Sequence, residues 1–317
     1  MSIQVVRTAD GWWVESSTAR LHPVATEAGT TAGLLADRSA VQEAAARAAA
    51  DPDAGPPARE GELLSPVTAP CRVVAQMVNY RSHAVDSGFD PDTVPPAFFR
   101  KASGSVSGPY QDIVRPPHVR FLDYEVELGL VMGADLPVGT EVTDATLPKY
   151  VAALVVADDV SARDLQLPKT QFYESKSYPT FTPLGPRLLL VDGDDLARLA
   201  DLRLTLKVNG ATRQDRTAGD MIVRPAHALG LLARFQTLQP GDVLLTGTPG
   251  GTALRSPGRL PATLGALLPP HKRWQMFFAR QAKNPDYLKD GDVVTARIAT
   301  DDGVLDLGEQ RTVVRAR

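Results

Sequence analysis

Cysteine, strong net charge and aromatic residues are all scarce in this sequence. Cys71 is the single cysteine among 317 residues, so an intrachain disulfide is excluded and the composition suits a reducing compartment such as the cytoplasm. A formal net charge of −3 provides no basic field that would attract nucleic acid or anionic lipid. We therefore expect no nucleic-acid or membrane partner.

Long apolar runs are missing as well. No stretch approaches the roughly 20 consecutive apolar residues of a membrane helix, and the first residues lack the apolar core of a signal peptide. These features predict a soluble cytoplasmic protein. Proline and glycine, by contrast, are plentiful, with 26 and 25 residues, which favours many short strands and turns over a helical bundle.

The composition changes near Pro66, where we place a domain boundary. Residues 3–20 alternate as in a hairpin, and an alanine-rich stretch over 39–49 predicts a helix that Ser39 could cap. A linker rich in proline, glycine and charge, DPDAGPPAREGE, follows. We expect a small accessory domain at 1–66 and a larger main domain at 67–317.

The most informative stretch begins with an alternating acidic strand, FLDYEVELGLVMG. Residues two apart share a strand face, so Glu125 and Glu127 point the same way, with Asp123 beside them. Carboxylates this close repel each other unless water or a cation neutralises them. On the residues alone, an exposed strand edge without a metal is the simpler alternative.

A second acidic element follows the apolar run 151–157, which has strand length and ends in Asp158 and Asp159. An acid at the end of a buried strand is well placed to become a third ligand. Carboxylate oxygens without clustered cysteine or histidine suit Mg²⁺, Mn²⁺ or Ca²⁺ better than zinc.

His83 and Asp86 form a candidate general-base pair in the segment NYRSHAVD. Three residues apart on a helix, they would share a face, and the carboxylate could orient and charge-stabilise the imidazole. An ordinary surface hydrogen bond is the alternative.

The two acidic elements, YEVELGLVMG and DDVSARDLQ, together resemble the fumarylacetoacetate hydrolase family. Matched residue by residue, the resemblance implies that Glu125, Glu127 and Asp159 are the metal ligands and that Asp158 is not. NYRSHAVD resembles the family's N-Y-x-x-H-x-x-E segment, in which the histidine and the acid activate water. Here Asp86 stands where acylpyruvate-cleaving members have glutamate, so its carboxylate lies about one methylene away.

The resemblance also implies substrate-binding residues. Lys176 matches a lysine that would hold an oxyanion or carboxylate of the substrate, and Gln166 would donate to a keto oxygen. Arg163 would pair with a carboxylate or with Asp164, a buried ion pair that holds the loop being the structural alternative. Thr248 lies in a turn that matches the family's Gly-Thr-Pro-x-Gly, and this turn lacks the Gly-Lys-Ser/Thr of a nucleotide-binding loop.

Two further segments have open roles. The segment around Lys101, rich in glycine, serine and proline, would be mobile and could close over a bound substrate as a lid, or be a plain surface loop. A long insertion over about 252–290 separates the Gly-Thr-Pro-x-Gly turn from the last strands. Its aromatic residues Trp274, Phe277 and Phe278 would cover the pocket, contact a partner subunit or fill the core.

The resemblance implies an α+β fold that is predominantly β, a mixed β-sheet roll with flanking helices, usually a homodimer. It also implies a divalent-metal-dependent hydrolase that cleaves the carbon-carbon bond of an acylpyruvate-type 1,3-dioxo acid through an enolate stabilised by the ion. The same metal ion and site residues would also serve an oxaloacetate-type decarboxylase, a 2-oxo-4-enoate hydratase or a tautomerase. A non-catalytic protein that binds small acids is a third interpretation. For the enzymatic interpretations the substrate is a small keto acid.

Overall fold

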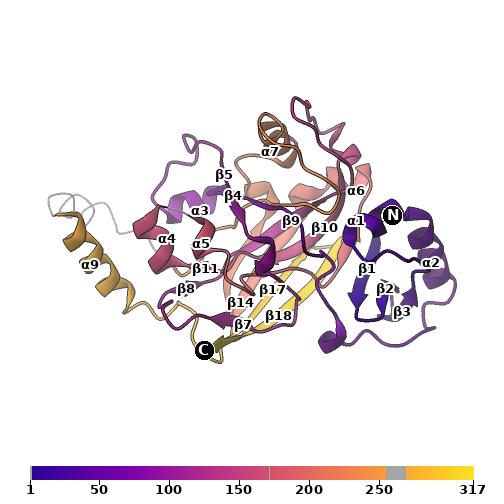
Figure 1. Ribbon diagram of the computed structural model, residues 1–317, viewed down its shortest axis with the longest axis horizontal. Coiled ribbons are helices and arrows are strands. Elements are labelled where there is room, and N and C mark those ends of the chain that lie inside the picture. The colour runs from indigo at the N-terminus through magenta and orange to yellow at the C-terminus, as the bar shows by residue number, and fades with distance from the viewer. Residues whose placement is uncertain (1, 171, 255–268) are drawn as a thin grey trace.

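Two large β-sheets build the molecule (Figure 1). The computed structural model describes residues 2–170, 172–254 and 269–317. The larger sheet has the strand order β3-β2-β1-β13-β10-β9-β16-β4-β5. Its strands are β1 (Ile3–Thr8), β2 (Gly11–Glu15), β3 (Leu21–Pro23), β4 (Val73–Met77), β5 (Ala97–Lys101), β9 (Val126–Met132), β10 (Val151–Asp158), β13 (Leu188–Leu190) and β16 (Val243–Leu245).

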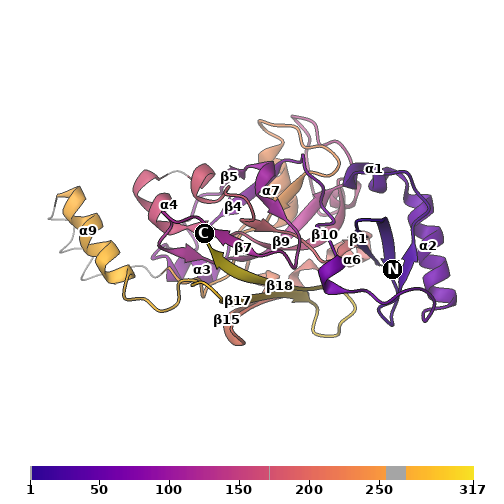
Figure 2. The same ribbon diagram turned by 60° about the horizontal axis from the view of Figure 1, so that its bottom comes forward.

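The second sheet has the order β15-β14-β17-β18-β7, and it lies along the lower side of the molecule in Figure 2. Two short ladders, β8 with β11 and β6 with β12, join the loops near the sheets. These strands are β6 (Val106–Ser107), β7 (Ile113–Arg115), β8 (Leu122–Asp123), β11 (Ser161–Ala162), β12 (Thr182–Pro183), β14 (Arg203–Val208), β15 (Ala211–Thr217), β17 (Val293–Ala299) and β18 (Asp306–Ala316).

Helices flank the sheets, and most are short. The α-helices are α1 (Thr31–Ala36), α2 (Arg38–Ala50), α3 (Arg81–Asp86), α4 (Arg163–Lys169), α5 (Phe172–Ser175), α6 (Gly193–Ala197), α7 (Pro225–Leu232) and α9 (Pro270–Gln281). Single 3-10 turns are η1 (Glu60–Glu62), η2 (Ser103–Ser105), η3 (Leu147–Lys149), η4 (Leu199–Asp201) and η5 (Ala218–Asp220). None of the described helices combines the length and the apolar character that crossing a bilayer requires.

This architecture confirms the predicted α+β class with a predominance of strands. A hairpin at Asn209-Gly210 joins β14 to β15, and Asn209 has the positive φ of +52° that such tight turns use. Ser39 is not the helix cap, because α2 already begins at Arg38 with Asp37 in the cap position.

The central strands are buried on both faces. Leu128 and Leu154 face the core shared with the second sheet, whereas Val131 and Val155 face a second core on the opposite side. Strand side chains alternate, so a strand covered on both sides becomes a continuous apolar run. This is why 151–157 contains no polar residue before Asp158.

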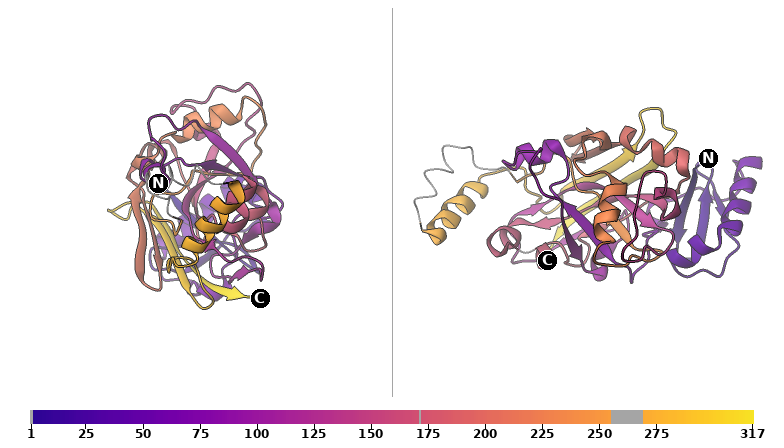
Figure 3. Two further views of the ribbon diagram at one scale, coloured as in Figure 1. Left: turned by 90° about the vertical axis from the view of Figure 1, so that its left-hand side faces the viewer. Right: turned by 90° about the horizontal axis from the view of Figure 1, so that it is seen from above.

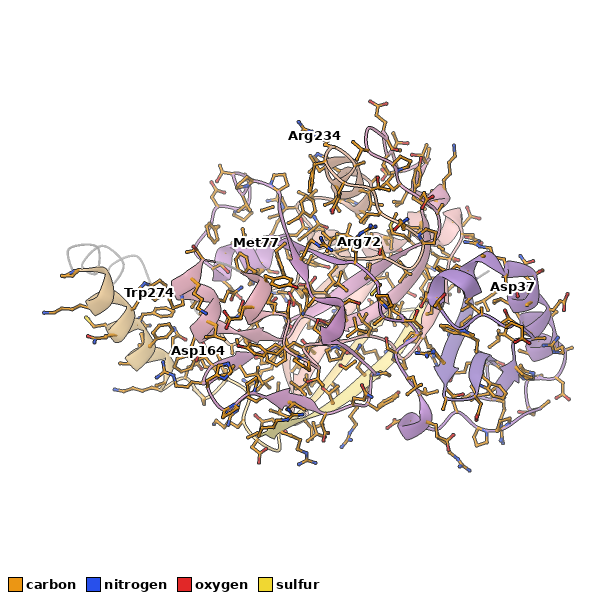
Figure 4. All side chains as sticks on the ribbon, in the orientation of Figure 1. Asp37, Arg72, Met77, Asp164, Arg234 and Trp274 are labelled. Carbon is orange, nitrogen blue, oxygen red and sulfur yellow. The ribbon has the colours of Figure 1, made fainter. Side chains whose placement is uncertain are left out.

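The N-terminal residues extend the larger sheet at one end of the molecule. β1 pairs antiparallel with β13, and α2 packs on β2 and β3 (Figure 1). The helix α9 lies at the other end and projects away from the sheets in Figure 1 and in the right view of Figure 3. Figure 4 accordingly shows Trp274 outside the sheets. Of the predicted insertion over about 252–290, residues 255–268 lie outside the described residues.

Candidate active site

Three buried carboxylates meet where β9 begins and β10 ends. The two strands are antiparallel, with Ala157 opposite Glu127 and Asp158 opposite Val126, so both acidic elements reach the same edge. Glu125, Glu127 and Asp159 each offer an oxygen, and these three oxygens lie within 4.8 Å of one another. The exposed fractions of these residues are 4%, 1% and 0%. The sequence-predicted ligand set is therefore a single buried cluster.

Three buried cations surround the cluster. The Lys176 ammonium donates to Glu125 Oε2 at 2.5 Å and to Asp159 Oδ2. The Arg163 guanidinium donates to Glu125 Oε1, also at 2.5 Å. Lys101 donates to the other oxygen of Asp159 and to the Phe181 carbonyl at 2.7 Å. Charges this deeply buried are tolerated only when they are paired and hydrogen-bonded, as they are here.

The two glutamates have opposite pKa shifts. Burial alone would raise the pKa of Glu125, but Arg163 and Lys176 outweigh burial and hold the pKa below its usual range. Burial raises the pKa of Glu127, and the negative charges of Asp159 and Glu125 raise it further. Neighbouring carboxylates resist ionising together unless a cation is added. The cluster therefore favours one more positive charge next to Glu127.

The donor set fits a hard divalent ion. It consists of carboxylate oxygens, the ligands that Mg²⁺, Mn²⁺ and Ca²⁺ prefer. Two of the buried polar atoms that have no hydrogen-bond partner among the described residues are Asp158 Oδ2, next to Asp159 in the chain, and Nδ1 of His83, whose ring interacts electrostatically with Glu125. Buried polar atoms of this kind are normally satisfied by water or a ligand. Burial also raises the pKa of Asp158 to about 7.

His83 lies on α3, which a network of hydrogen bonds fixes in place. Ser82 donates from its backbone N–H and its hydroxyl to Asp220 Oδ2, at 3.0 and 2.6 Å, and its hydroxyl accepts from the Gly250 N–H at 2.9 Å. The His83 side chain is buried, with 8% exposure. Burial lowers its pKa, and Glu125 only partly opposes this effect. The lowered pKa favours the neutral imidazole, which is the form that a general base requires.

Asp86, the predicted partner of His83, holds a glycine turn. Its Oδ2 accepts a hydrogen bond from the Gly251 N–H at 2.9 Å. Gly251 has a φ of +105°, and a Cβ there would lie 2.0 Å from the Arg213 carbonyl oxygen, so only glycine fits. The structure thus gives the Asp86 carboxylate an anchoring contact that the sequence did not predict.

Arg163 forms a buried ion pair, the role that the sequence analysis gave as the alternative to substrate binding. Its Nε donates to Asp123 Oδ2 at 2.9 Å and its Nη1 to Gln166 Oε1 at 2.7 Å. The predicted pairing with Asp164 is wrong, because Asp164 accepts instead from the backbone N–H groups of Arg120 and Phe121. With its carbonyl held by Arg163, Gln166 can offer its amide N–H to a keto oxygen.

Thr248 belongs to the turn that closes the site from β16. Its hydroxyl donates to the Val126 carbonyl at 2.9 Å and accepts from Gln214 Nε2 at 2.8 Å. The neighbouring Gly247 N–H donates to Glu127 Oε2 at 2.8 Å. The Thr248 hydroxyl therefore fastens the turn to β9. A contact between Thr248 and the substrate stays a prediction.

Lys101 is the functional candidate that sequence reasoning missed. Its segment, interpreted as a mobile loop or lid, starts as the strand β5, where Lys101 pairs with Val73. Phe99 on the same strand lies 5.1 Å from the Lys176 ammonium and 5.2 Å from the Phe172 ring, forming an aromatic wall. A lysine among glycines and serines gives no sequence signal of burial, so only the structure could place it.

Comparison with known proteins identifies the family. The sequence profile described as Fumarylacetoacetate (FAA) hydrolase C-terminal matches residues 72–315, which is more than half of the chain. The chain belongs to the fumarylacetoacetate hydrolase family. The predicted resemblance is confirmed, and the family includes enzymes described as hydrolases, isomerases and tautomerases.

Within the family, the chain is similar to the oxaloacetate tautomerase Fahd2a, mitochondrial, of Rattus norvegicus. The two are 36% identical over 201 residues, which cover 62% of each chain, so the match spans less than two thirds of that relative.

Two solved structures share the fold. One is a probable 2-hydroxyhepta-2,4-diene-1,7-dioate isomerase from Mycobacterium abscessus, with 27% identity and a TM-score of 0.71, covering 100% of this chain and 99% of that one. The other is a fumarylpyruvate hydrolase from Pseudomonas aeruginosa in complex with Mn²⁺ and pyruvate. It has 25% identity and a TM-score of 0.59, covering 80% of this chain and 91% of the other.

Proposed function

We propose that this protein is a divalent-metal-dependent hydrolase that cleaves the carbon-carbon bond of an acylpyruvate-type 1,3-dioxo acid. The observation that carries the proposal is the buried carboxylate cluster, which is paired with Lys101 and Lys176 and interacts electrostatically with the buried His83. The Mn²⁺ and pyruvate in the Pseudomonas hydrolase support the same assignment, since pyruvate is one product of such a cleavage.

Glu125, Glu127 and Asp159 would hold Mg²⁺, or alternatively Mn²⁺ or Ca²⁺. When bound, the ion would supply Lewis-acid stabilisation to the oxygens of the 2-oxo acid. Lys176 donates to two of the three ligand residues, so it lies where it can also donate to an oxygen of the substrate. Gln166 donates its amide N–H to the keto oxygen. The Phe99 ring keeps water from one side of the Lys176 ammonium.

His83 would act as the general base. It removes a proton from a water molecule, whose oxygen adds to the distal carbonyl carbon. The bond from that carbon to C3 then breaks, and its electron pair forms the enolate of pyruvate, which takes up a proton at C3. The products are a carboxylic acid and pyruvate. Asp86 on the same helix is proposed to assist His83, and Thr248 to support the substrate from the turn.

A second candidate is oxaloacetate tautomerisation, favoured by the similarity to the rat tautomerase. It would need the same cluster and a proton transfer between carbon and oxygen, with no attack by water. Decarboxylation of oxaloacetate and hydration of a 2-oxo-4-enoate are related alternatives, because each passes through an enolate.

Turnover of acetylpyruvate, fumarylpyruvate and oxaloacetate, each with Mg²⁺, Mn²⁺ or EDTA, tests the proposal. We expect metal-dependent release of pyruvate from an acylpyruvate, lost in Glu125→Ala and His83→Ala. If the protein converts enol oxaloacetate to the keto form and cleaves no acylpyruvate, the function is tautomerisation and not hydrolysis. Full turnover after complete metal removal would overturn both. The proposal includes a cytoplasmic homodimer, to be tested by sedimentation and cell fractionation.

A further inference from the structure

Asp123 is fully buried and receives four hydrogen bonds, although it is not one of the three clustered ligand residues. Its Oδ2 accepts from Arg163 Nε at 2.9 Å and from the Leu254 N–H at 3.0 Å. Its Oδ1 accepts from the N–H groups of Ala253, at 2.8 Å, and Tyr124, at 2.9 Å. We propose that Asp123 is a positioning residue that sets the geometry of the metal ligand Glu125 through Arg163.

Each nitrogen of the Arg163 guanidinium donates a hydrogen bond to a different side chain. Nε binds Asp123, Nη1 binds Gln166 and Nη2 binds Glu125 Oε1. The other oxygen, Glu125 Oε2, accepts from Lys176, which also donates to Asp159 of the cluster. An arginine readily forms two parallel bonds to one carboxylate. Without Asp123, the guanidinium would be free to take Glu125 by both oxygens and turn it away from the cluster.

The other partners of Asp123 connect this geometry to the start of the long insertion. Ala253 and Leu254 lie at this start, directly before residue 255, and both donate their N–H groups to Asp123. Asn284, after α9, donates its side-chain N–H to the Ala253 carbonyl at 2.7 Å. One carboxylate thus holds both the arginine and the backbone of the insertion, so Asp123 cannot shift without moving both.

The inference rests on the metal-binding part of the proposed function, and binding of Mn²⁺ without substrate is the measurement that isolates it. We expect Asp123→Asn to weaken Mn²⁺ binding by about 10-fold to 100-fold, the usual effect of losing a group that orients a metal ligand. The electron paramagnetic resonance spectrum of bound Mn²⁺ should also change, because the arrangement of its ligands changes.

Asp242→Asn is the matched control. Asp242 is also buried, with 5% exposure, and accepts hydrogen bonds from an arginine, Arg72, and from backbone N–H groups. It lies at the far end of β9, where its carbonyl accepts from the Met132 N–H at 2.9 Å. Asp242→Asn should lose stability in urea unfolding and keep the Mn²⁺ affinity. An equal loss of Mn²⁺ affinity in both variants would overturn the proposal.

A double-mutant cycle tests whether Asp123 acts through Arg163. In an Arg163→Met background, Asp123→Asn should change the Mn²⁺ affinity by less than about 3-fold. A full additive effect there would overturn the proposal. If Asp123→Asn does not fold, Arg163→Lys carries the test, because an ammonium cannot replace the planar fork between Asp123 and Glu125. Unchanged affinity in Arg163→Lys contradicts the inference, whereas failure of the wild type to bind Mn²⁺ contradicts the proposed function itself.

Discussion

Lys101 on β5 and Asp159 after β10 form an ion pair in which neither side chain has any exposed surface. Such a pair forms only because the chain between them folds back through β6 to β10, so it is a purely tertiary feature. Burial lowers the pKa of Lys101, and the charge of Asp159 opposes that shift. Lys101 thus balances the charge of one proposed metal ligand through Oδ1, the oxygen that Lys176 does not bind.

Replacing Lys101 with methionine should destabilise the protein in EDTA by about 3 kcal/mol, because Asp159 would lose a buried counter-charge. Urea unfolding measures the change. The control is Lys169→Met, whose ion pair with Glu174 is about half exposed and should be worth about 1 kcal/mol or less. Equal losses in the two variants would contradict the buried pairing.

Glu127→Gln should abolish tight binding of Mn²⁺. The carboxylate of Glu127 belongs to the ligand cluster, and its pKa is raised by burial and further by the charges of Asp159 and Glu125. We expect a loss in affinity of about 100-fold or more, beyond the range for residues that only support a ligand. Titration calorimetry provides the measurement, with Glu309→Gln on the exposed side of β18 as the control. Retained affinity would exclude Glu127 as a ligand.

The activity should remain constant as the pH falls from 8 to 6.5. A free histidine gains its proton near pH 6.5, but burial lowers the pKa of His83, so the neutral base persists to a more acidic pH. The acid limb of kcat/KM in the wild type should therefore lie below pH 6.5. In His83→Ala the rate should fall by about 100-fold to 10,000-fold and this acid limb should disappear. An acid limb above pH 6.5 that remains in His83→Ala would assign the base elsewhere.

Asp86→Asn separates two roles of one carboxylate. The amide oxygen can still accept the Gly251 N–H, so the stability should hardly change. If the negative charge assists His83 as proposed, kcat should fall by on the order of 100-fold. Stopped-flow turnover together with thermal unfolding makes the distinction. Wild-type kcat in this variant would reduce Asp86 to an anchor of the glycine turn.

Part of this site was predictable because its signal is local. Alternation along one strand places Glu125 and Glu127 on one face, and an apolar run that stops at Asp158 marks where a buried strand ends. The residues alone also suggested a third acid after that run and the pair of His83 with Asp86. The family resemblance selected Asp159 and added Lys176, and the structure brings the three acids and Lys176 together.

The rest depends on contacts between distant segments. Asp123 pairs with Arg163 forty residues later, and no spacing rule links the two. Lys101 has the composition of a surface loop around it, so its burial follows only from the pairing of β5 with β4. The position of α9 depends on the stacking of Phe278 on Phe121, 5.6 Å between ring centroids, which no periodicity reveals.

The pairing of β1 with β13 has a consequence for any attempt to dissect the chain. Ile3, Gln4 and Val5 lie opposite Leu190, Leu189 and Leu188. Cutting at the composition change near Pro66 would strip this cover and leave three consecutive leucines on an open strand edge. Unpaired apolar edges recruit strands from other molecules. A fragment starting at residue 67 should therefore aggregate. By pairing with β13, the N-terminal strand β1 protects an apolar strand edge from intermolecular pairing.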